Sequence, residues 1–287
     1  MKSRAYEKSS SNGLLSRLYR NITEHWMVFA VYCILSLFCL GVLIYSSIRK
    51  DGLGIFNSLL CLALFLLPPF LEDRLQIRFS ATLKIVTMLF IFSAQILGEA
   101  GMYYARFPFW DDLLHWINGF LFAAFGFSLA EICNRSRRAI FHLSPFYLAL
   151  VACCFSLSIG VLWEFLEFGI DMLAHADMQK DTLLTAVSSG VLSDSGQTSV
   201  TVNQITQTVI TTADGQTYTL DGYLDIGLID TMKDLLVDFV GALIFSLIGY
   251  FHLKQTKPHP LADALIPKVP PSPAVSEKRH PPAFKKR

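Results

Sequence analysis

The sequence predicts an all-α fold: a polytopic membrane bundle of about six transmembrane helices, with a small β-hairpin in an outer loop. Hydrophobic residues make up 53% of the 287 residues and charged residues only 16%, whereas soluble domains carry about 25% charged residues. Six apolar stretches approach the length of about 20 residues that a helix needs to cross a bilayer. Lys and Arg also concentrate in alternate connections between these stretches, as is typical of multipass proteins.

The six predicted spans follow one another along residues 26–252, which form the predicted transmembrane domain. They are Trp26–Ile48, Leu53–Leu71, Ala81–Met102, Trp110–Cys133, Pro145–Ile170 and Ile226–Phe251. The first span is too long for a cleaved signal peptide, so we interpret it as a retained helix. The second contains Pro68 and Pro69, which we expect to end or kink the helix because proline cannot donate a backbone hydrogen bond.

The distribution of basic residues predicts that both termini are cytoplasmic. Residues 1–25, the connection after the second span (counted with Lys84), the connection after the fourth span and the C-terminal tail hold 5, 3, 3 and 8 Lys or Arg residues. The alternate side, with Lys233 inside the sixth span, holds 5 of the total of 24. Cytoplasmic loops carry the excess of basic residues in multipass proteins, so the first group of segments is expected to lie inside.

Two segments lie outside the predicted helices. Residues 172–225 form a polar outer loop, in which Thr208–Thr211 and Gln216–Leu220 flank Asp214-Gly215, a typical hairpin signal. An isolated hairpin is only marginally stable, so we expect this one to pack on the bundle or on a partner. Residues 253–287 form a proline-rich basic cytoplasmic tail, which we expect to be disordered and to approach anionic lipid.

Ionisable residues occur at helical spacing in the last three spans, so each set occupies one side of its helix. The sets are Asp111 and His115 in the fourth span, Glu164, Glu167 and Asp171 in the fifth, and Asp230, Asp234 and Asp238 in the sixth. With both termini in the cytoplasm, all three sets lie in the outer half of the bilayer. Ionised carboxylates there are costly unless they are paired, hydrated or bound to a cation.

Mutual repulsion among these carboxylates indicates a bound cation. An imidazole with carboxylates suits a divalent metal ion such as Zn, Mn, Fe or Mg, and no Cys belongs to the cluster. We expect four residues to converge on one ion and three to act as further ligands or to support the ligands. The four are His115, Glu164, Glu167 and Asp234, and the three are Asp111, Asp230 and Asp238.

Structural interpretations of the same residues stay open. Asp111 and Asp112 fit the hydrated N-terminus of a helix, where carboxylates meet the macrodipole favourably. Asp171 and Asp230 fit interfacial positions, and His115 fits a hydrogen bond to a neighbouring helix. The remaining acidic residues are harder to explain in this way, because apolar residues surround them.

Three motifs in this region resemble the YjdF-like proteins, an uncharacterised family of bacterial multipass membrane proteins. They are Asp112-Leu-Leu-His115-x3-Gly119, Trp163-Glu164-x2-Glu167-Phe168 and Gly227-Leu-Ile-Asp230-Thr-Met-x-Asp234-x3-Asp238-x2-Gly241-Ala242. More loosely, a His on one helix, a Glu on the next and Asp-x3-Asp-x2-Gly on a third resemble the VanZ-like glycopeptide-resistance proteins. The resemblance to the YjdF-like proteins covers roughly residues 95–250 and implies a location in the bacterial cell membrane. Neither resemblance implies a known reaction.

Three functions fit these residues. The first is a metal-dependent enzyme that acts on a lipid-linked phosphate at the outer leaflet, with Arg106 or Lys233 contacting the phosphate. The second is a cation or proton transporter, although the inner half of the spans offers only scattered polar groups and no inverted repeat. The third is a non-catalytic scaffold with a structural cation. An open coordination position favours the enzyme and a closed one the scaffold.

The charge balance limits the expected partners. A formal net charge of +1 excludes a strongly basic nucleic-acid binder. The expected partners are therefore membrane lipids and the lipid-linked substrate, while the oligomeric state stays open.

Overall fold

The computed structural model describes residues 26–75, 77–135, 142–254 and 264–266. Within these ranges six helices are long and apolar enough to cross a membrane, which confirms the predicted fold class. They are Trp26–Arg49, Gly52–Arg74, Ala81–Ala100, Trp110–Asn134, Pro145–Ala174 and Leu228–Lys254. The chain separates into two compact units. The first consists of Met1–Trp110, Ala124–Ala152 and Ser246–Arg287, and the second of Asp111–Ala123 and Cys153–Phe245.

Helices from the N-terminal half form most of the first unit. Helix α2 (Trp26–Arg49) contacts α3 (Gly52–Leu64) and α5 (Ala81–Phe92). The Asp51 side chain accepts a hydrogen bond from Gly54 N at the start of α3, and Ser80 does the same for Leu83 N at the start of α5. One cluster of buried residues packs among these helices: Leu35, Cys39, Cys61, Phe65, Met88, Ile91, Phe92 and Ile96.

The second span is interrupted where the prolines predict it. Helix α3 ends at Leu64 and α4 begins at Leu67 and ends at Leu75. Pro68 and Pro69 lie in the first turn of α4, where a missing N–H costs least. The expected break is therefore confirmed, and it falls just before the two prolines.

The third span is not one uniform helix. Residues Ser93–Ala100 form a π-helix, η1, directly after α5, and a short helix α6 (Tyr103–Arg106) follows. Met102 between them has a positive φ of 58°. The wider winding of η1 brings Gly98 against the Tyr104 ring, which would collide with any Cβ at this position. The predicted continuous helix over Ala81–Met102 therefore changes its winding halfway.

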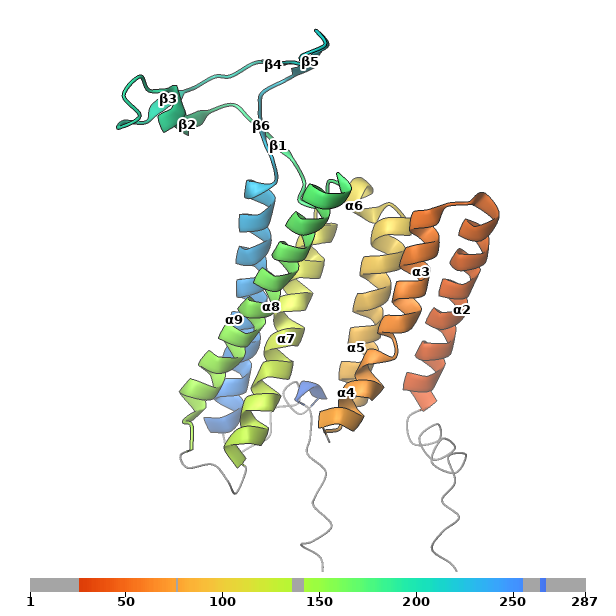
Figure 1. Ribbon diagram of the computed structural model, residues 1–287. Coiled ribbons are helices and arrows are strands. Elements are labelled where there is room, and N and C mark those ends of the chain that lie inside the picture. Colours follow the sequence, from red (N-terminus) through yellow and green to blue (C-terminus); the bar gives the residue numbers. More distant parts are fainter. Residues whose placement is uncertain (1–25, 76, 136–141, 255–263, 267–287) are drawn as a thin grey trace, which may run out of the picture. The chain divides into compact units, whose positions relative to one another are not determined.

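Parts of three helices belong to the second unit and lie side by side there (Figure 1). The helices are α7 (Trp110–Arg135), α8 (Pro145–Ala174) and α9 (Leu228–Lys254), and each ends a few residues later than its predicted span. The backbones of α7 and α9 approach so closely that a Cβ at Gly119 of α7 would collide with Asp238 O of α9. The Ser156 hydroxyl of α8 donates a hydrogen bond of 2.7 Å to Gly119 O.

The connection between α8 and α9 carries six short strands in three antiparallel pairs. The pairs are β1 (Thr182–Leu184) with β6 (Tyr223–Asp225), β2 (Val187–Ser189) with β3 (Val200–Val202), and β4 (Thr208–Thr211) with β5 (Thr217–Leu220). The last pair confirms the predicted hairpin, with Thr208 opposite Leu220 and Gly215 at a φ of +84° in the turn. The other two pairs were not predicted.

We call residues 181–226 the arm. It lies beyond the ends of α8 and α9 (Figure 1). Within these residues, all of which the structure describes, Gly222 alone is buried. The arm therefore has no hydrophobic core of its own, and its packing on a partner stays a prediction.

Little of the terminal segments belongs to the described residues. The predicted N-terminal segment 1–25 lies outside them, as does most of the predicted tail 253–287. In the part of the tail that is described, the Ser80 hydroxyl donates a hydrogen bond to Ala264 O. Leu265 and Ile266 are buried.

Candidate metal centre

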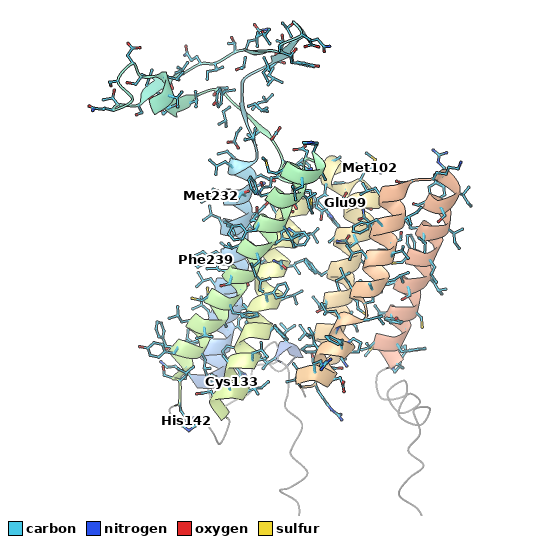
Figure 2. All side chains as sticks on the ribbon, in the orientation of Figure 1. Glu99, Met102, Cys133, His142, Met232 and Phe239 are labelled. Atoms are coloured by element: carbon cyan, nitrogen blue, oxygen red, sulfur yellow. The ribbon has the colours of Figure 1, made fainter. Side chains whose placement is uncertain are left out.

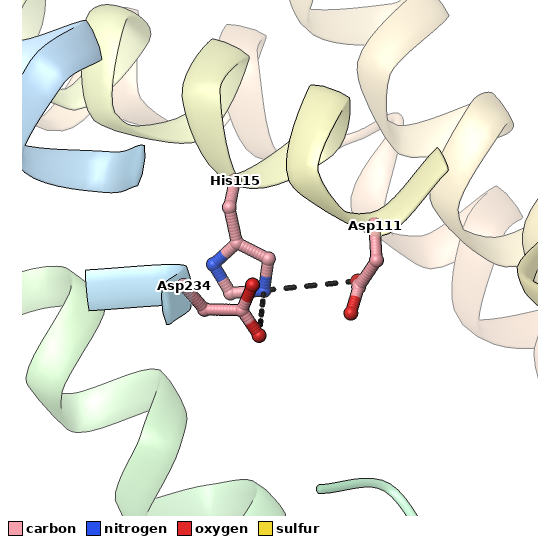
Figure 3. A group of neighbouring side chains, drawn as sticks. All are labelled: Asp111, His115 and Asp234. Atoms are coloured by element: carbon pink, nitrogen blue, oxygen red, sulfur yellow. Dashed lines mark ion pairs between the residues drawn. The ribbon is translucent and has the colours of Figure 1, made fainter. Parts of the chain in front are cut away.

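Two helices bring an imidazole between two carboxylates. Asp111 and His115 lie one turn apart on α7, and Asp234 comes from α9. His115 Nε2 lies 3.8 Å from Asp111 Oδ1 and 3.7 Å from Asp234 Oδ2. Figure 3 shows both carboxylates approaching this same nitrogen. The three ligand atoms lie within 4.8 Å of one another, a spacing that could hold a metal ion.

Asp238 approaches the opposite side of the same imidazole. Its Oδ2 lies 3.5 Å from His115 Nδ1, and its Oδ1 accepts a hydrogen bond of 3.2 Å from Asn118 Nδ2. Gly160 of α8 leaves room for this carboxylate, because a Cβ there would lie 2.5 Å from Asp238 Oδ2. Asp238 is therefore placed to orient the imidazole from the nitrogen opposite Asp111 and Asp234.

Burial makes this arrangement costly without a further positive charge. Asp234 and Asp238 are each 1% exposed and His115 is 6% exposed. Both carboxylate oxygens of Asp234 lack a hydrogen-bond partner among the described residues, as do Asp238 Oδ2 and His115 Nδ1. A buried carboxylate oxygen without a hydrogen bond loses its hydration without full compensation. A cation between these groups would remove that cost.

The two glutamates of α8 are buried next to the cluster but have partners of their own. Glu164 Oε2 accepts a hydrogen bond of 3.3 Å from Gln179 Nε2, whereas Glu164 Oε1 is buried without a partner among the described residues. Glu167 Oε1 accepts a bond of 2.8 Å from Trp163 Nε1. The close group of ligand atoms includes neither glutamate. Their convergence on the same ion stays a prediction.

Asp171 and Asp230 bind the backbone of the α8–α9 connection and do not contact the imidazole within the hydrogen bonds and ion pairs of the described residues. The Asp171 carboxylate accepts hydrogen bonds from the backbone N–H groups of Met178 and Gln179, at 2.7 and 2.8 Å. Asp230 Oδ2 accepts one of 2.7 Å from Lys180 N. Asp230 was expected as a ligand or a supporting residue, and in the structure its partner is the loop backbone.

Lys233 is engaged outside the cluster. Its Nζ lies 2.7 Å from Asp112 Oδ1, and its side chain is 50% exposed. Lys233 lies one residue before Asp234, so it points about 100° away from Asp234 around the helix. Met232 and Phe239, which lie on the side of α9 opposite the row of aspartates, are exposed in Figure 2.

Sequence reasoning missed two residues of the site, Gln179 and Thr231. Gln179 Nε2 donates to Thr231 Oγ1 at 2.6 Å as well as to Glu164. Thr231 stands inside one of the three motifs, next to Asp230, which was a usable signal. Gln179 stands in the loop outside any periodic pattern, so no spacing argument could identify it.

The donor set determines what the site can do chemically. One imidazole nitrogen and two carboxylate oxygens form a mixed N/O set of the kind that binds Zn, Mn or Fe. Three ligand atoms from the protein leave coordination positions for water or for a substrate oxygen. An ion held in this way could activate water or polarise a phosphoryl or carbonyl oxygen.

A family model described as "Predicted membrane protein (DUF2238)" matches residues 31–255. The chain therefore belongs to this family of membrane proteins, which is consistent with the resemblance to the YjdF-like proteins. The match includes the described cluster and the arm, but it does not show the looser VanZ-like resemblance. No curated protein and no solved structure matches the chain.

Proposed function

We propose that this protein binds one divalent cation through Asp111, His115 and Asp234 and uses it as a metal-dependent enzyme. The observation that supports this most directly is Asp234, which is 1% exposed and whose two carboxylate oxygens have no hydrogen-bond partner among the described residues. The imidazole nitrogen that faces it also faces a second carboxylate. A cation satisfies all three groups at once, whereas a single shared proton satisfies at most two of them.

The ligand types favour Zn, Mn or Fe over Mg. Imidazole suits these transition metals, whereas Mg prefers oxygen ligands and keeps several waters. With three protein ligands the ion retains an open position, which is the arrangement of catalytic sites. An ion held by these residues would make bound water a nucleophile at neutral pH. We therefore favour metal-assisted hydrolysis or transfer over a purely structural cation.

The depth of the site suggests the kind of substrate. Asp234 follows Leu228, the first residue of α9, by six residues, or about 9 Å along the helix axis. An ion at this depth is accessible to a substrate that partitions into the bilayer. A lipid-linked phosphate combines an apolar anchor with oxygen atoms that bind such an ion. We propose such a lipid at the outer face of the cell membrane as the substrate.

Metal analysis of the protein, purified gently and without chelator, tests the cation site. We expect about one ion per chain in the wild type and clear loss in Asp234→Asn, which keeps the shape but removes the charge. Asp214→Asn, in the exposed hairpin turn, is the matched control and should keep the metal. A wild type without stoichiometric metal, or an Asp234→Asn protein that still holds it, would reject the proposal.

Water coordination separates the enzyme from a scaffold with a structural cation. In Mn-substituted protein, an open position holds exchangeable water that spin-relaxation measurements detect. A closed ligand shell without such water would favour the scaffold. Lipid-linked phosphates added to the same sample should displace part of that water.

A further inference from the structure

The loop that leaves α8 is fastened at three consecutive residues. Asp171 accepts hydrogen bonds from the backbone N–H groups of Met178 and Gln179, and Asp230 accepts one from Lys180. All three bonds lie between 2.7 and 2.8 Å. Each is a charge-assisted bond to a backbone donor, which is stronger than a neutral one. The backbone of residue 179 therefore has a fixed position relative to α8 and α9.

From this fixed backbone the Gln179 side chain reaches both helices. Its amide nitrogen donates to Thr231 Oγ1 at 2.6 Å and to Glu164 Oε2 at 3.3 Å. One carboxylate oxygen of Glu164 is thus held by a loop side chain that also contacts α9 through Thr231.

The start of α9 is shaped to admit Gln179. Gly227 has a φ of +86°, and a Cβ on it would lie 2.6 Å from the Gln179 Cβ. Glycine is therefore required here for its backbone conformation and for the close approach of the loop. The Asp225 side chain caps the same helix by accepting a bond of 2.8 Å from Ile229 N.

The other oxygen of Glu164 remains available. Glu164 is 4% exposed, and its Oε1 is buried without a hydrogen-bond partner among the described residues. The carboxylate interacts electrostatically with His115 and with Asp234. A buried carboxylate oxygen left free beside a candidate cation site is poorly accounted for unless it faces a ligand.

We propose that Gln179 is a positioning residue of the cation site: it binds Oε2 of Glu164 and so presents Oε1 to the ion as an additional ligand. The inference rests on the proposed cation site. It assigns to the loop a role in metal affinity, since Gln179 orients a ligand without touching the ion. Groups that orient metal ligands typically change metal affinity by about 10–100-fold when they are removed.

The experiment uses the full-length protein, stripped of metal and titrated with Mn²⁺. Gln179→Ala should weaken Mn²⁺ binding by about tenfold or more. Gln216→Ala is the matched control, because its side chain bonds only within the exposed hairpin, and it should bind as the wild type does. Thr231→Val is a second variant that should weaken binding in the same direction if Gln179→Ala does not fold.

A double-mutant cycle separates positioning from a general loss of stability. Because Gln179 acts through Glu164, Gln179→Ala should have no further effect on Mn²⁺ affinity in a Glu164→Gln background. Independent, additive losses would overturn the inference, and so would a Gln179→Ala protein that binds Mn²⁺ like the wild type.

The failure of this inference can be told from that of the cation site. If the wild type binds Mn²⁺ and the Gln179 variant binds equally well, only the positioning role is rejected. If the wild type binds no Mn²⁺, the cation site is rejected and the positioning role with it.

Discussion

The three aspartates on one side of α9 have three different partners. Asp230 accepts a hydrogen bond from the loop at Lys180 N, Asp234 faces His115 Nε2, and Asp238 faces His115 Nδ1. Residues four apart on a helix differ by about 40° in direction and 6 Å along the axis. This small rotation is enough to assign one aspartate to the loop, one to the proposed ion and one to the back of the imidazole.

The separate partners predict a ranking of metal affinities for single Asp→Asn variants. Asp234→Asn should lower the Mn²⁺ affinity most, because it removes a ligand. Asp238→Asn should lower the Mn²⁺ affinity by about 10–100-fold, because the imidazole keeps its place but is no longer oriented by the carboxylate. Asp230→Asn should lower the Mn²⁺ affinity least, because the Asp230 carboxylate binds the loop backbone and not the imidazole. Titration of each metal-free variant with Mn²⁺ gives the order, and equal losses at all three positions would contradict the assignment of roles.

At the scale of the helices, glycines determine how closely α7, α8 and α9 can approach. A Cβ on Gly241 of α9 would collide with Trp116 O of α7, and a Cβ on Gly119 of α7 would collide with Asp238 O of α9. In membranes such small residues permit the backbone contact that drives helix association. They also place the aspartates of α9 next to the imidazole of α7. Helix packing and the candidate metal centre therefore depend on the same positions.

Alanine substitutions test this dependence. Gly241→Ala should lower the thermal stability of the detergent-solubilised protein, by about 1–3 kcal/mol, because the new methyl group meets backbone that cannot move aside. Gly169→Ala in α8 is the matched control, since nothing lies within 4 Å of the place that its methyl group would occupy, and it should leave the melting temperature unchanged. Equal melting temperatures for both variants would show that α7 and α9 do not touch as described.

The elements that the sequence predicts well are those whose signals are local. Six long apolar stretches identify the spans, Pro68 and Pro69 identify the break in the second, and Asp214-Gly215 identifies the hairpin. The i, i+4 spacing likewise places Asp111 beside His115, because a single helix fixes both. Each of these predictions uses residues close together in the chain.

The features that the sequence did not predict depend on distant contacts. Strands β1 and β6 pair with each other but are the first and last strands of the arm in the sequence. Each has only three residues, so neither has a recognisable pattern of its own. The π-helix η1 has the same residue types as an α-helix, and no periodicity distinguishes the two. Gln179 gains its role from Glu164 and Thr231, which lie on two other elements. Such contacts become visible only when the chain has folded.

At the scale of the whole chain, the cluster of Asp111, His115 and Asp234 and the arm belong to the same unit. The arm connects the end of α8 to the start of α9, and Asp234 lies near that start (Figure 1). The arm contains five aspartates between residues 181 and 226 and no Lys, Arg or Glu. The segments assigned to the cytoplasm carry 19 of the 24 basic residues. This polarity would place the proposed ion and its substrate on the outer side of the membrane.

Labelling of intact cells tests that orientation. Single cysteines are introduced in a background from which the six native cysteines have been removed. Ser195→Cys, exposed in the arm, should react with a membrane-impermeant maleimide, because positive-inside orientation places the arm outside. Ser276→Cys, in the tail beyond the described residues, should react only after the cells are opened. The reverse pattern would move the cation site to the cytoplasmic side, and a lipid-linked phosphate of the outer leaflet could then not be its substrate.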